Sequence, residues 1–150
     1  MGRSRTMTRA ESMRMLEHEI GVVMRRIRRN IAERAKMVHP DLSAAGYSML
    51  LALDEGGPRR SSELAELFTI DKGAVSRQVS QLHNLGFVTR EQDPVDGRAQ
   101  LLSITPEAQE RLAEVIKQRR KRFDERLSMW DAAELSDFVR ALARYNESLD

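Results

Sequence analysis

Apolar residues recur at spacings of three, four or seven along the first part of the chain, which is the period of one face of an α-helix. Thr8 and Glu11 form a capping-box pattern before this stripe, and Pro40 after it cannot continue a helix. The pattern predicts one helix roughly 45 Å long, from the Thr8 cap to Pro40. A small domain cannot cover a helix of this length, so the stripe is expected to need an outside partner. Its members are Met13, Leu16, Ile20, Val23, Ile27, Ile31 and Val38.

Three shorter helices are predicted from the caps and breaks in the middle of the chain. Ser43 and Asp71 are placed as N-caps, whereas the run Glu55-Gly56-Gly57-Pro58 and, later, Gly86 end helices. Thr69 makes the tight turn between the second and third of them with Ile70. The predicted segments run from the Ser43 cap through Leu53, from Ser61 or Ser62 to Phe68, and from Lys72 to Leu85.

The period changes to that of β-strands after Gly86. Two short strand-like runs, Phe87 to Gln92 and Ala99 to Ile104, flank the turn sequence Asp93-Pro94-Val95-Asp96-Gly97-Arg98 and predict an antiparallel hairpin. Helical patterns return from Pro106 to about Met129, and again after Asp131. The order of elements predicts a mainly α (α+β) fold, a winged helix-turn-helix with a two-stranded wing between long N- and C-terminal helices.

Composition narrows the class of protein without changing this prediction. The chain has 150 residues, of which 41% are hydrophobic and 32% charged, a balance typical of one folded protomer. It contains no cysteine, which excludes disulfides, thiolate metal sites and cysteine nucleophiles. Its apolar runs are far shorter than the roughly 18 residues of a membrane span. Because no signal-peptide pattern follows the basic start, we expect a cytoplasmic protein.

Charge is distributed unevenly along the chain. Residues 1–40 carry ten Lys and Arg against four Asp and Glu, although the whole chain has a net charge of only +2. A basic flank fits a polyanionic partner, but a solvated helix face with a disordered basic tail over residues 1–7 explains it equally well. The basic runs Arg25 to Arg29 and Lys117 to Arg122 allow the same two interpretations, of which the solvated face is favoured.

The predicted helix from Lys72 to Leu85 has two chemically different sides. When successive residues are placed about 100° apart, Val75, Val79 and Leu82 cluster on one side. The opposite arc carries no carboxylate beyond the capping Asp71, which favours a surface for the DNA major groove over an ordinary solvated face. Lys and Arg suit phosphates and guanine edges, Ser suits either, and Gly lets a backbone approach closely. The arc holds Lys72, Gly73, Ser76, Arg77 and Ser80, with Gln81 at its border.

The turn of the predicted hairpin offers a second contact for DNA. Arg98 would project from a narrow loop that fits a minor groove, where the negative potential of A·T tracts attracts Arg. Asp96 is close enough in sequence to orient the guanidinium of Arg98. An ordinary surface turn with a local ion pair is the alternative, and the turn alone favours neither interpretation.

The ordered set of these motifs resembles the MarR (multiple antibiotic resistance regulator) family of bacterial transcription factors. The resemblance covers residues 60–112 closely, and the flanking long helices agree with it in position and length. No single segment is diagnostic, whereas the ordered set is specific. The segments that carry it are Ser62-Glu63-Leu64-Ala65, Asp71-Lys72-Gly73-Ala74-Val75-Ser76-Arg77-Gln78-Val79, Leu85-Gly86-Phe87-Val88, and Asp93-Pro94-Val95-Asp96-Gly97-Arg98-Ala99 ahead of Leu102-Ser103-Ile104-Thr105.

The resemblance implies a homodimer that binds a pseudo-palindromic operator, acts as a repressor and is released by a small aromatic or phenolic effector. It implies a dimerisation region over residues 8–40 and 105–150, and a DNA-binding lobe over residues 41–104. The effector would bind at the junction of the long helix and the lobe, a position occupied by Met24, Tyr47, Met49 and Leu50.

The resemblance also implies individual roles at the DNA. By position, Ser76 and Arg77 would read bases and Lys72 would contact a phosphate or a base. Arg98, held by Asp96, would enter the minor groove.

Three positions depart from the family's pattern. Arg60 stands where many members have a Thr that pairs with Glu63 in a capping box, Gly46 stands where Gln or Glu is common, and Ala108 replaces a Gly. The first two are expected to weaken local helix caps. None of the three lies on the predicted DNA surface.

Other function classes receive no support from the sequence. There is no HExxH, no phosphate-binding Gly-rich loop and no recognisable Ser/His/Asp arrangement, so we expect no enzyme activity. His18, His39 and His83 are scattered without ligand spacing, so we expect no metal or cofactor, although a site shared by two subunits stays open. The alternative to a DNA-binding regulator is a winged-helix module that binds another protein.

Overall fold

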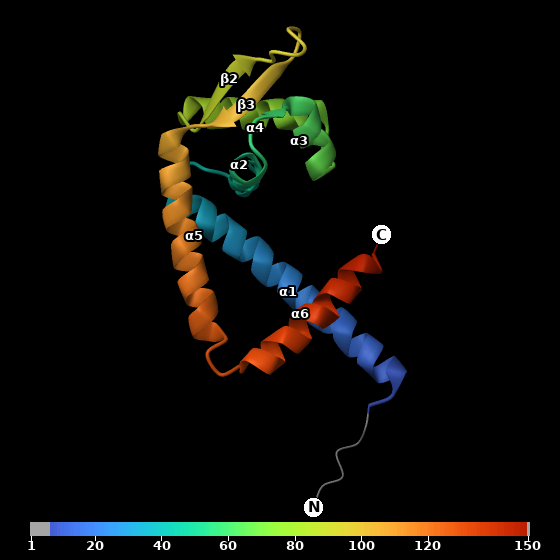
Figure 1. Ribbon diagram of the computed structural model, residues 1–150. Helices are drawn as coiled ribbons and strands as arrows, with labels where there is room; N and C mark the ends of the chain where they lie inside the picture. The colour runs from blue at the N-terminus through green and yellow to red at the C-terminus, as the bar shows by residue number, and fades with distance from the viewer. Residues whose placement is uncertain (1–6, 150) are drawn as a thin grey trace, which may run out of the picture. The chain divides into compact units, whose positions relative to one another are not determined.

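The computed structural model describes residues 7–149, which excludes all but Met7 of the tail predicted over residues 1–7. The chain divides into two units, one ending at Leu112 and the other beginning at Ala113. Its elements follow in the order α1 (Arg9–Val38), α2 (Ala44–Gly56), β1 (Arg59–Arg60), α3 (Ser61–Phe68), α4 (Lys72–Asn84), β2 (Val88–Gln92), β3 (Gln100–Ile104), α5 (Pro106–Arg126) and α6 (Ala132–Glu147) (Figure 1).

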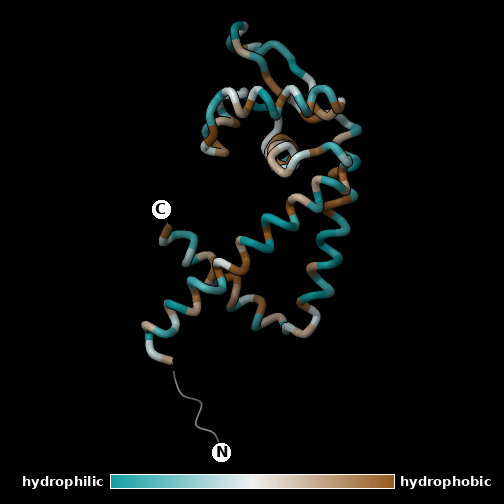
Figure 2. The backbone as a smooth tube through the Cα atoms, turned by 180° about the vertical axis from the view of Figure 1, so that it is seen from behind, coloured by the Kyte–Doolittle hydropathy of each residue, from teal (hydrophilic) through white to brown (hydrophobic). Residues whose placement is uncertain are grey.

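Helix α1 begins at the predicted capping box. The Thr8 side chain accepts a hydrogen bond from the Glu11 N–H at 3.2 Å, and the Glu11 carboxylate accepts one from the Thr8 N–H at 2.8 Å. Apolar positions recur between polar ones along the helix (Figure 2). Among the described residues of α1, however, only Ala35 and Val38 are buried. Most of the apolar stripe is therefore left uncovered within the chain.

Helix α2 is joined to α4 through its own cap. The Ser43 hydroxyl accepts from the Gly46 N–H at 2.9 Å and donates to Oε1 of Gln78 at 2.8 Å. A Cβ at Gly46 would lie 2.9 Å from Cδ1 of Leu42 and 3.3 Å from Cδ2 of Leu82. Packing against Leu42, which precedes α2, and against Leu82 of α4 thus leaves little room for a Gln or Glu at this position.

Two helix boundaries differ from the prediction. Helix α2 continues past Leu53 to Gly56, because Gly57, with φ 73°, is the first residue whose backbone ends the helix. The N-cap of α3 is Arg60, not Ser61 or Ser62, and the Arg60 N–H donates to the Glu63 carboxylate at 2.6 Å. A Thr at this position would also accept a hydrogen bond from the Glu63 N–H through its side chain. Arg60 makes no such bond, because its guanidinium turns towards the wing.

The sheet has three antiparallel strands in the order β1-β3-β2. Strands β2 and β3 form the predicted wing, each one residue shorter at its start than expected, with Val88 opposite Ile104. Strand β1 adds a third strand that the sequence did not predict, since two residues are too short to show a period. The loop between β2 and β3 projects beyond the helices of this unit (Figure 1).

The core of the first unit is built from every one of its elements except the two-residue β1. The ring of Phe87 lies edge-on to His39, with centroids 5.7 Å apart, and beneath the Arg111 guanidinium at 5.7 Å. Arg111 also donates to the Val38 carbonyl at 3.3 Å, so the start of α5 is tied to the end of α1. The buried apolar side chains are Ala35, Val38, Leu42, Tyr47, Met49, Leu50, Leu53, Leu64, Val75, Val79, Leu82, Phe87, Val88, Leu102, Ala108 and Leu112.

The second unit contains the remainder of α5 and all of α6. Helix α5 ends at Arg126, one turn earlier than predicted. The predicted cap Asp131 starts α6 by accepting from the N–H groups of Ala133 at 2.8 Å and Glu134 at 2.9 Å. Within the described part of α6 no residue is buried, although Phe138 packs edge-on against Trp130 at 5.6 Å.

Candidate nucleic-acid interface

Helix α4 presents one side to the core and the other to solvent. The Asp71 carboxylate caps it by accepting from the Ala74 N–H at 2.8 Å. Val75, Val79 and Leu82 are buried, as the periodicity predicts. The packing of these three residues fixes the rotation of the helix about its axis, and with it the side chains that face outward.

The predicted arc of α4 faces solvent except at its border. Gln81 is half-buried, and its Nε2 donates to the Asp41 carbonyl at 2.8 Å, so its amide serves the link between α1 and α2. Among the described residues the exposed arc adds no carboxylate to the capping Asp71. The exposed members are Lys72, Gly73, Ser76, Arg77 and Ser80.

Because Gly73 has no side chain, the surface is flat at the N-terminal end of this arc. A Cβ there would lie 3.0 Å from the Asp71 carboxylate and 3.6 Å from Nη1 of Arg77. A larger residue would therefore crowd the capping carboxylate of Asp71 and make ordinary contact with the Arg77 guanidinium. The flat surface also allows the backbone of α4 to come close to a ligand.

Arg90 extends the basic surface in a way that the sequence analysis did not predict. It lies on the exposed side of β2, and its Nη2 is 3.5 Å from the Ser80 hydroxyl of α4. Strand alternation offers no signal for its exposure, because Val88, two residues earlier and therefore on the same face of an ideal strand, is buried. Its position beside Ser80 depends on how the hairpin packs on α4.

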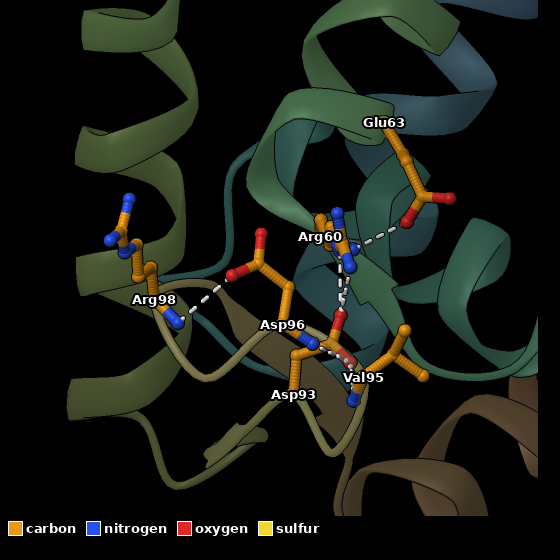
Figure 3. A network of polar contacts seen from close by, with 6 residues as sticks. All are labelled: Arg60, Glu63, Asp93, Val95, Asp96 and Arg98. Carbon is orange, nitrogen blue, oxygen red and sulfur yellow. Dashed lines mark hydrogen bonds and ion pairs between the residues drawn. The ribbon is translucent and has the colours of Figure 1, made fainter.

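The wing loop is held by Asp93, and Asp96, which was predicted to orient the Arg98 guanidinium, contacts the backbone of Arg98 instead. The carboxylate of Asp96 accepts from the backbone N–H of Arg98 at 3.1 Å, and the Arg98 guanidinium extends away from it (Figure 3). Asp93 is only 6% exposed, and its Oδ2 accepts from Nε of Arg60 at 2.6 Å and from Nη2 at 2.5 Å. Asp96 therefore shapes the turn and leaves the guanidinium of Arg98 exposed.

Local hydrogen bonds shift the protonation of the buried carboxylate. The backbone N–H of Val95 is the largest cause that lowers the pKa of Asp93 below its ordinary value, and the Arg60 guanidinium lowers that pKa further, against the effect of burial. The same pair raises the pKa of Arg60. Asp93 is thus a carboxylate and Arg60 a cation throughout the neutral range.

A groove of about 310 Å³ lies between α1, α2 and the turn from α3 to α4. Of the four residues predicted at an effector site, only Met49 lines this groove. Tyr47 and Leu50 are buried in the core instead, and Met24 is half exposed on α1. The lining residues are Arg28, Ile31, Ala44, Ala45, Ser48, Met49, Phe68 and Ile70.

Residues 7–149 contain neither a cluster of metal ligands nor a membrane-spanning helix. No three His, Asp or Glu side chains in this range gather into a possible metal site. No helix in it is both long and apolar enough to cross a membrane.

Comparison with known proteins identifies the family. A sequence model of the MarR family matches residues 41–99. The chain is also 31% identical to the HTH-type transcriptional regulator YxaD of Bacillus subtilis over 134 residues. This aligned region covers 89% of this chain and 92% of YxaD. The chain belongs to the MarR family. As a MarR-family protein it is a DNA-binding transcriptional regulator and not an enzyme.

Solved structures agree with the fold of this MarR-family chain. The transcriptional regulator BldR from Sulfolobus solfataricus is 26% identical with a TM-score of 0.67, over 92% of this chain and 99% of BldR. Wild-type MarR from E. coli in its apo form has a TM-score of 0.70 over 87% of this chain and 96% of its own, and at 21% identity it shows likeness of fold alone. The predicted winged helix-turn-helix is confirmed.

Proposed function

We propose that this MarR-family regulator is a homodimeric repressor that reads a pseudo-palindromic operator with two copies of α4. The observation that carries the proposal is the exposed arc of α4, which is basic and hydroxyl-bearing and lies directly over a buried apolar side. Ser76 and Arg77 lie near the middle of the arc and would read base edges in the major groove. Lys72 and Ser80 would contact phosphates at its two ends.

The wing supplies the second contact in this proposal. Arg98 is exposed at the tip of a narrow loop, and its guanidinium has no carboxylate partner among the hydrogen bonds and ion pairs of residues 7–149. A free guanidinium is attracted to the negative potential of a narrow minor groove. Arg90, beside Ser80, adds a positive charge between α4 and the wing.

Uncovered apolar side chains support dimerisation through the long helices, which we assign to residues 8–40 and 105–150. On α1, Leu16, Val23 and Ile27 are each more than two-fifths exposed, and on α6 Phe138 and Val139 are more than half exposed. Helix faces of this kind are covered by another chain in stable proteins. Two lobes held about 34 Å apart would engage successive major grooves together, which raises affinity through effective concentration.

The groove between α1, α2 and the α3–α4 turn has the chemistry for the proposed aromatic or phenolic effector. Ile31, Met49 and Phe68 supply an apolar lining, while Arg28 and Ser48 supply a cation and a hydroxyl for an anionic or phenolic oxygen. An effector that favours one separation of the lobes would shift the population towards it, by no more than its difference in affinity for the two states.

Gel shifts on a duplex selected from a random-sequence library test the DNA assignment. Arg77→Ala is expected to weaken binding by about 1 to 3 kcal/mol and to relax the preference at one base pair. Lys72→Ala is expected to weaken all sequences alike and to lower the salt slope by about 1. Arg59→Ala is the matched control, because the Arg59 guanidinium contacts the Ala52 carbonyl, 3.4 Å away, and lies on neither the arc nor the wing.

Three outcomes are distinguished by this experiment. Unchanged affinity for both α4 variants overturns the assignment of the recognition helix. Equal binding of selected and random duplexes, or none, favours a protein-binding winged module instead. Release of the selected duplex by a panel of phenols and aromatic acids, abolished in Ala45→Phe, tests the groove, since Ala45 is exposed there and a phenyl ring would fill it.

A further inference from the structure

The ion pair between Arg60 and Asp93 joins two segments that are far apart in the chain. Arg60 is the N-cap of α3, and Asp93 begins the wing loop. The two nitrogens of the guanidinium reach the same carboxylate oxygen at 2.6 and 2.5 Å, and Asp93 is only 6% exposed while the Arg60 side chain is 35% exposed. A short, charge-assisted and mostly buried pair is held more firmly than an exposed one.

The other oxygen of Asp93 shapes the loop itself. Its Oδ1 accepts from the backbone N–H of Val95 at 2.8 Å and from that of Asp96 at 3.3 Å, which is the pattern of an Asx turn. Asp96 in turn accepts from the N–H of Arg98. A continuous line of contacts therefore runs from the guanidinium of Arg60 to the backbone of Arg98 (Figure 3).

The remaining polar contacts of the loop stay within the hairpin. Gln92 donates to the Gly97 carbonyl at 2.7 Å, and the Asp93 N–H donates to the Ala99 carbonyl at 3.0 Å. Among the hydrogen bonds and ion pairs given for residues 7–149, the Arg60–Asp93 pair is the one that ties the loop to a helix of the lobe. Without it, the hairpin would keep its internal register and its pairing with β1, but the loop at its tip would lose its tie to the start of α3.

We propose that Arg60 is a positioning residue of the DNA-binding surface, which holds the wing loop through Asp93 so that Arg98 meets the minor groove while α4 occupies the major groove. Arg60 does not itself contact DNA in this arrangement, because its guanidinium is engaged with Asp93. The inference rests on the proposed function and adds the element that sets the spacing between its two DNA contacts.

Epistasis with Arg98 tests the proposal. The probe is a duplex recovered from a random-sequence library by selection with the wild-type protein, and affinity is measured for Arg60→Gln alone and in an Arg98→Ala background. Arg60→Gln is expected to weaken binding by about tenfold alone, the size of one lost arginine contact, and to have almost no further effect once Arg98 is absent. Arg60→Lys keeps the positive charge but lacks the paired nitrogen donors of a guanidinium, so it should recover part of the lost affinity.

Hydroxyl-radical footprints separate positioning from a general loss of stability. In Arg60→Gln, protection of the minor groove next to the major-groove site is expected to disappear, while protection under α4 persists. Arg59→Gln, which removes the same charge from the neighbouring residue of β1, is expected to leave both footprints intact. Thermal unfolding of the variants shows whether either substitution also destabilises the lobe.

Several results would overturn the inference. If Arg60→Gln weakens binding equally with and without Arg98, then Arg60 acts on DNA directly or through stability alone. If Arg98→Ala binds as tightly as the wild type, there is no wing contact to position. In both cases a loss of affinity in Arg77→Ala would still support the proposed function, whereas unchanged affinity in both Arg77→Ala and Lys72→Ala would overturn the proposed function itself.

Discussion

Helix α2 buries five of its thirteen residues, whereas the longer α6, with sixteen, buries none within the described chain. Helix α1 resembles α6 in this respect, since its two buried residues, Ala35 and Val38, both lie at its C-terminal end. The winged lobe thus covers its own apolar side chains, and the terminal helices leave theirs exposed. The difference indicates that the lobe obtains its stability from contacts within one chain, and it supports the proposed dimer, in which a second copy would cover the terminal helices.

The largest expected effect tests the self-contained core of the lobe. Leu82, only 1% exposed, lies against Gly46 of α2. We expect Leu82→Ala to lower the free energy of unfolding by about 2 to 5 kcal/mol, because it opens a cavity between α2 and α4. Leu67→Ala is the matched control, since Leu67 is 54% exposed, and urea unfolding of the two variants measures the difference. Equal losses would mean that the lobe is not packed as described.

The second prediction tests the uncovered face of α1. We expect Val23→Asp, at a residue that is 51% exposed, to weaken dimerisation at least about tenfold, because it places a charge in an apolar contact between subunits. His18→Asp, at an exposed position on the opposite side of the helix, is expected to leave the dimer intact. Sedimentation over a range of concentrations measures both. A dimer unaffected by Val23→Asp would place the interface elsewhere.

A smaller effect is expected at the junction of α4 and the wing. Gly86 has a φ of 73°, and a Cβ there would meet nothing within 4 Å, so the cost of Gly86→Ala is backbone strain alone. We expect a loss of about 1 kcal/mol in the free energy of unfolding for Gly86→Ala, and a larger loss for Gly57→Ala, because its φ of 73° and ψ of −168° lie in a region open essentially to glycine alone. If denaturant titration showed that Gly86→Ala stabilises the chain, the left-handed backbone at this turn would be contradicted.

The smallest expected effect is the stability contributed by ionised Asp93, which is lost in acid. Because the Val95 N–H and then the Arg60 guanidinium lower the folded pKa of Asp93, the ionised carboxylate contributes stability above the unfolded pKa of about 3.9, and that stability is lost as pH falls through the folded value. Arg60, Glu63 and Asp96 are the charged groups around it, and Arg60 stays protonated throughout. Unfolding of wild type and Asp93→Asn should therefore differ by a constant amount at neutral pH and converge in acid. A difference in stability that widens in acid would contradict the lowered pKa of Asp93.

The comparison extends to the two proposed DNA contacts, which are held by different means. The arc of α4 is set by a buried apolar side, so helical periodicity alone predicted which residues face outward, and Ser76 and Arg77 are exposed as expected. The wing loop has no such side. Its orientation depends on the pair of Arg60 and Asp93, 33 residues apart, which no local pattern reveals.

Local chemistry was sufficient to predict the caps at Thr8, Ser43, Asp71 and Asp131, because each cap joins groups within three residues of one another. For the same reason the helices and the hairpin could be placed to within a few residues. The fold class followed from their order, and the family from the ordered set of motifs.

Packing between distant segments decided the remainder. From the sequence, Arg60 in place of Thr predicts only a weakened helix cap. Arg60 meets its partner Asp93 because β1 pairs with β3 and brings α3 beside the wing. Gln81 is turned from the DNA surface by a carbonyl 40 residues away, and Gly46 packs closely against Leu42 ahead of its own helix and against Leu82 of another helix. Such contacts depend on the course of the whole chain, because a side chain's neighbours in space are set by tertiary packing and not by its neighbours in sequence.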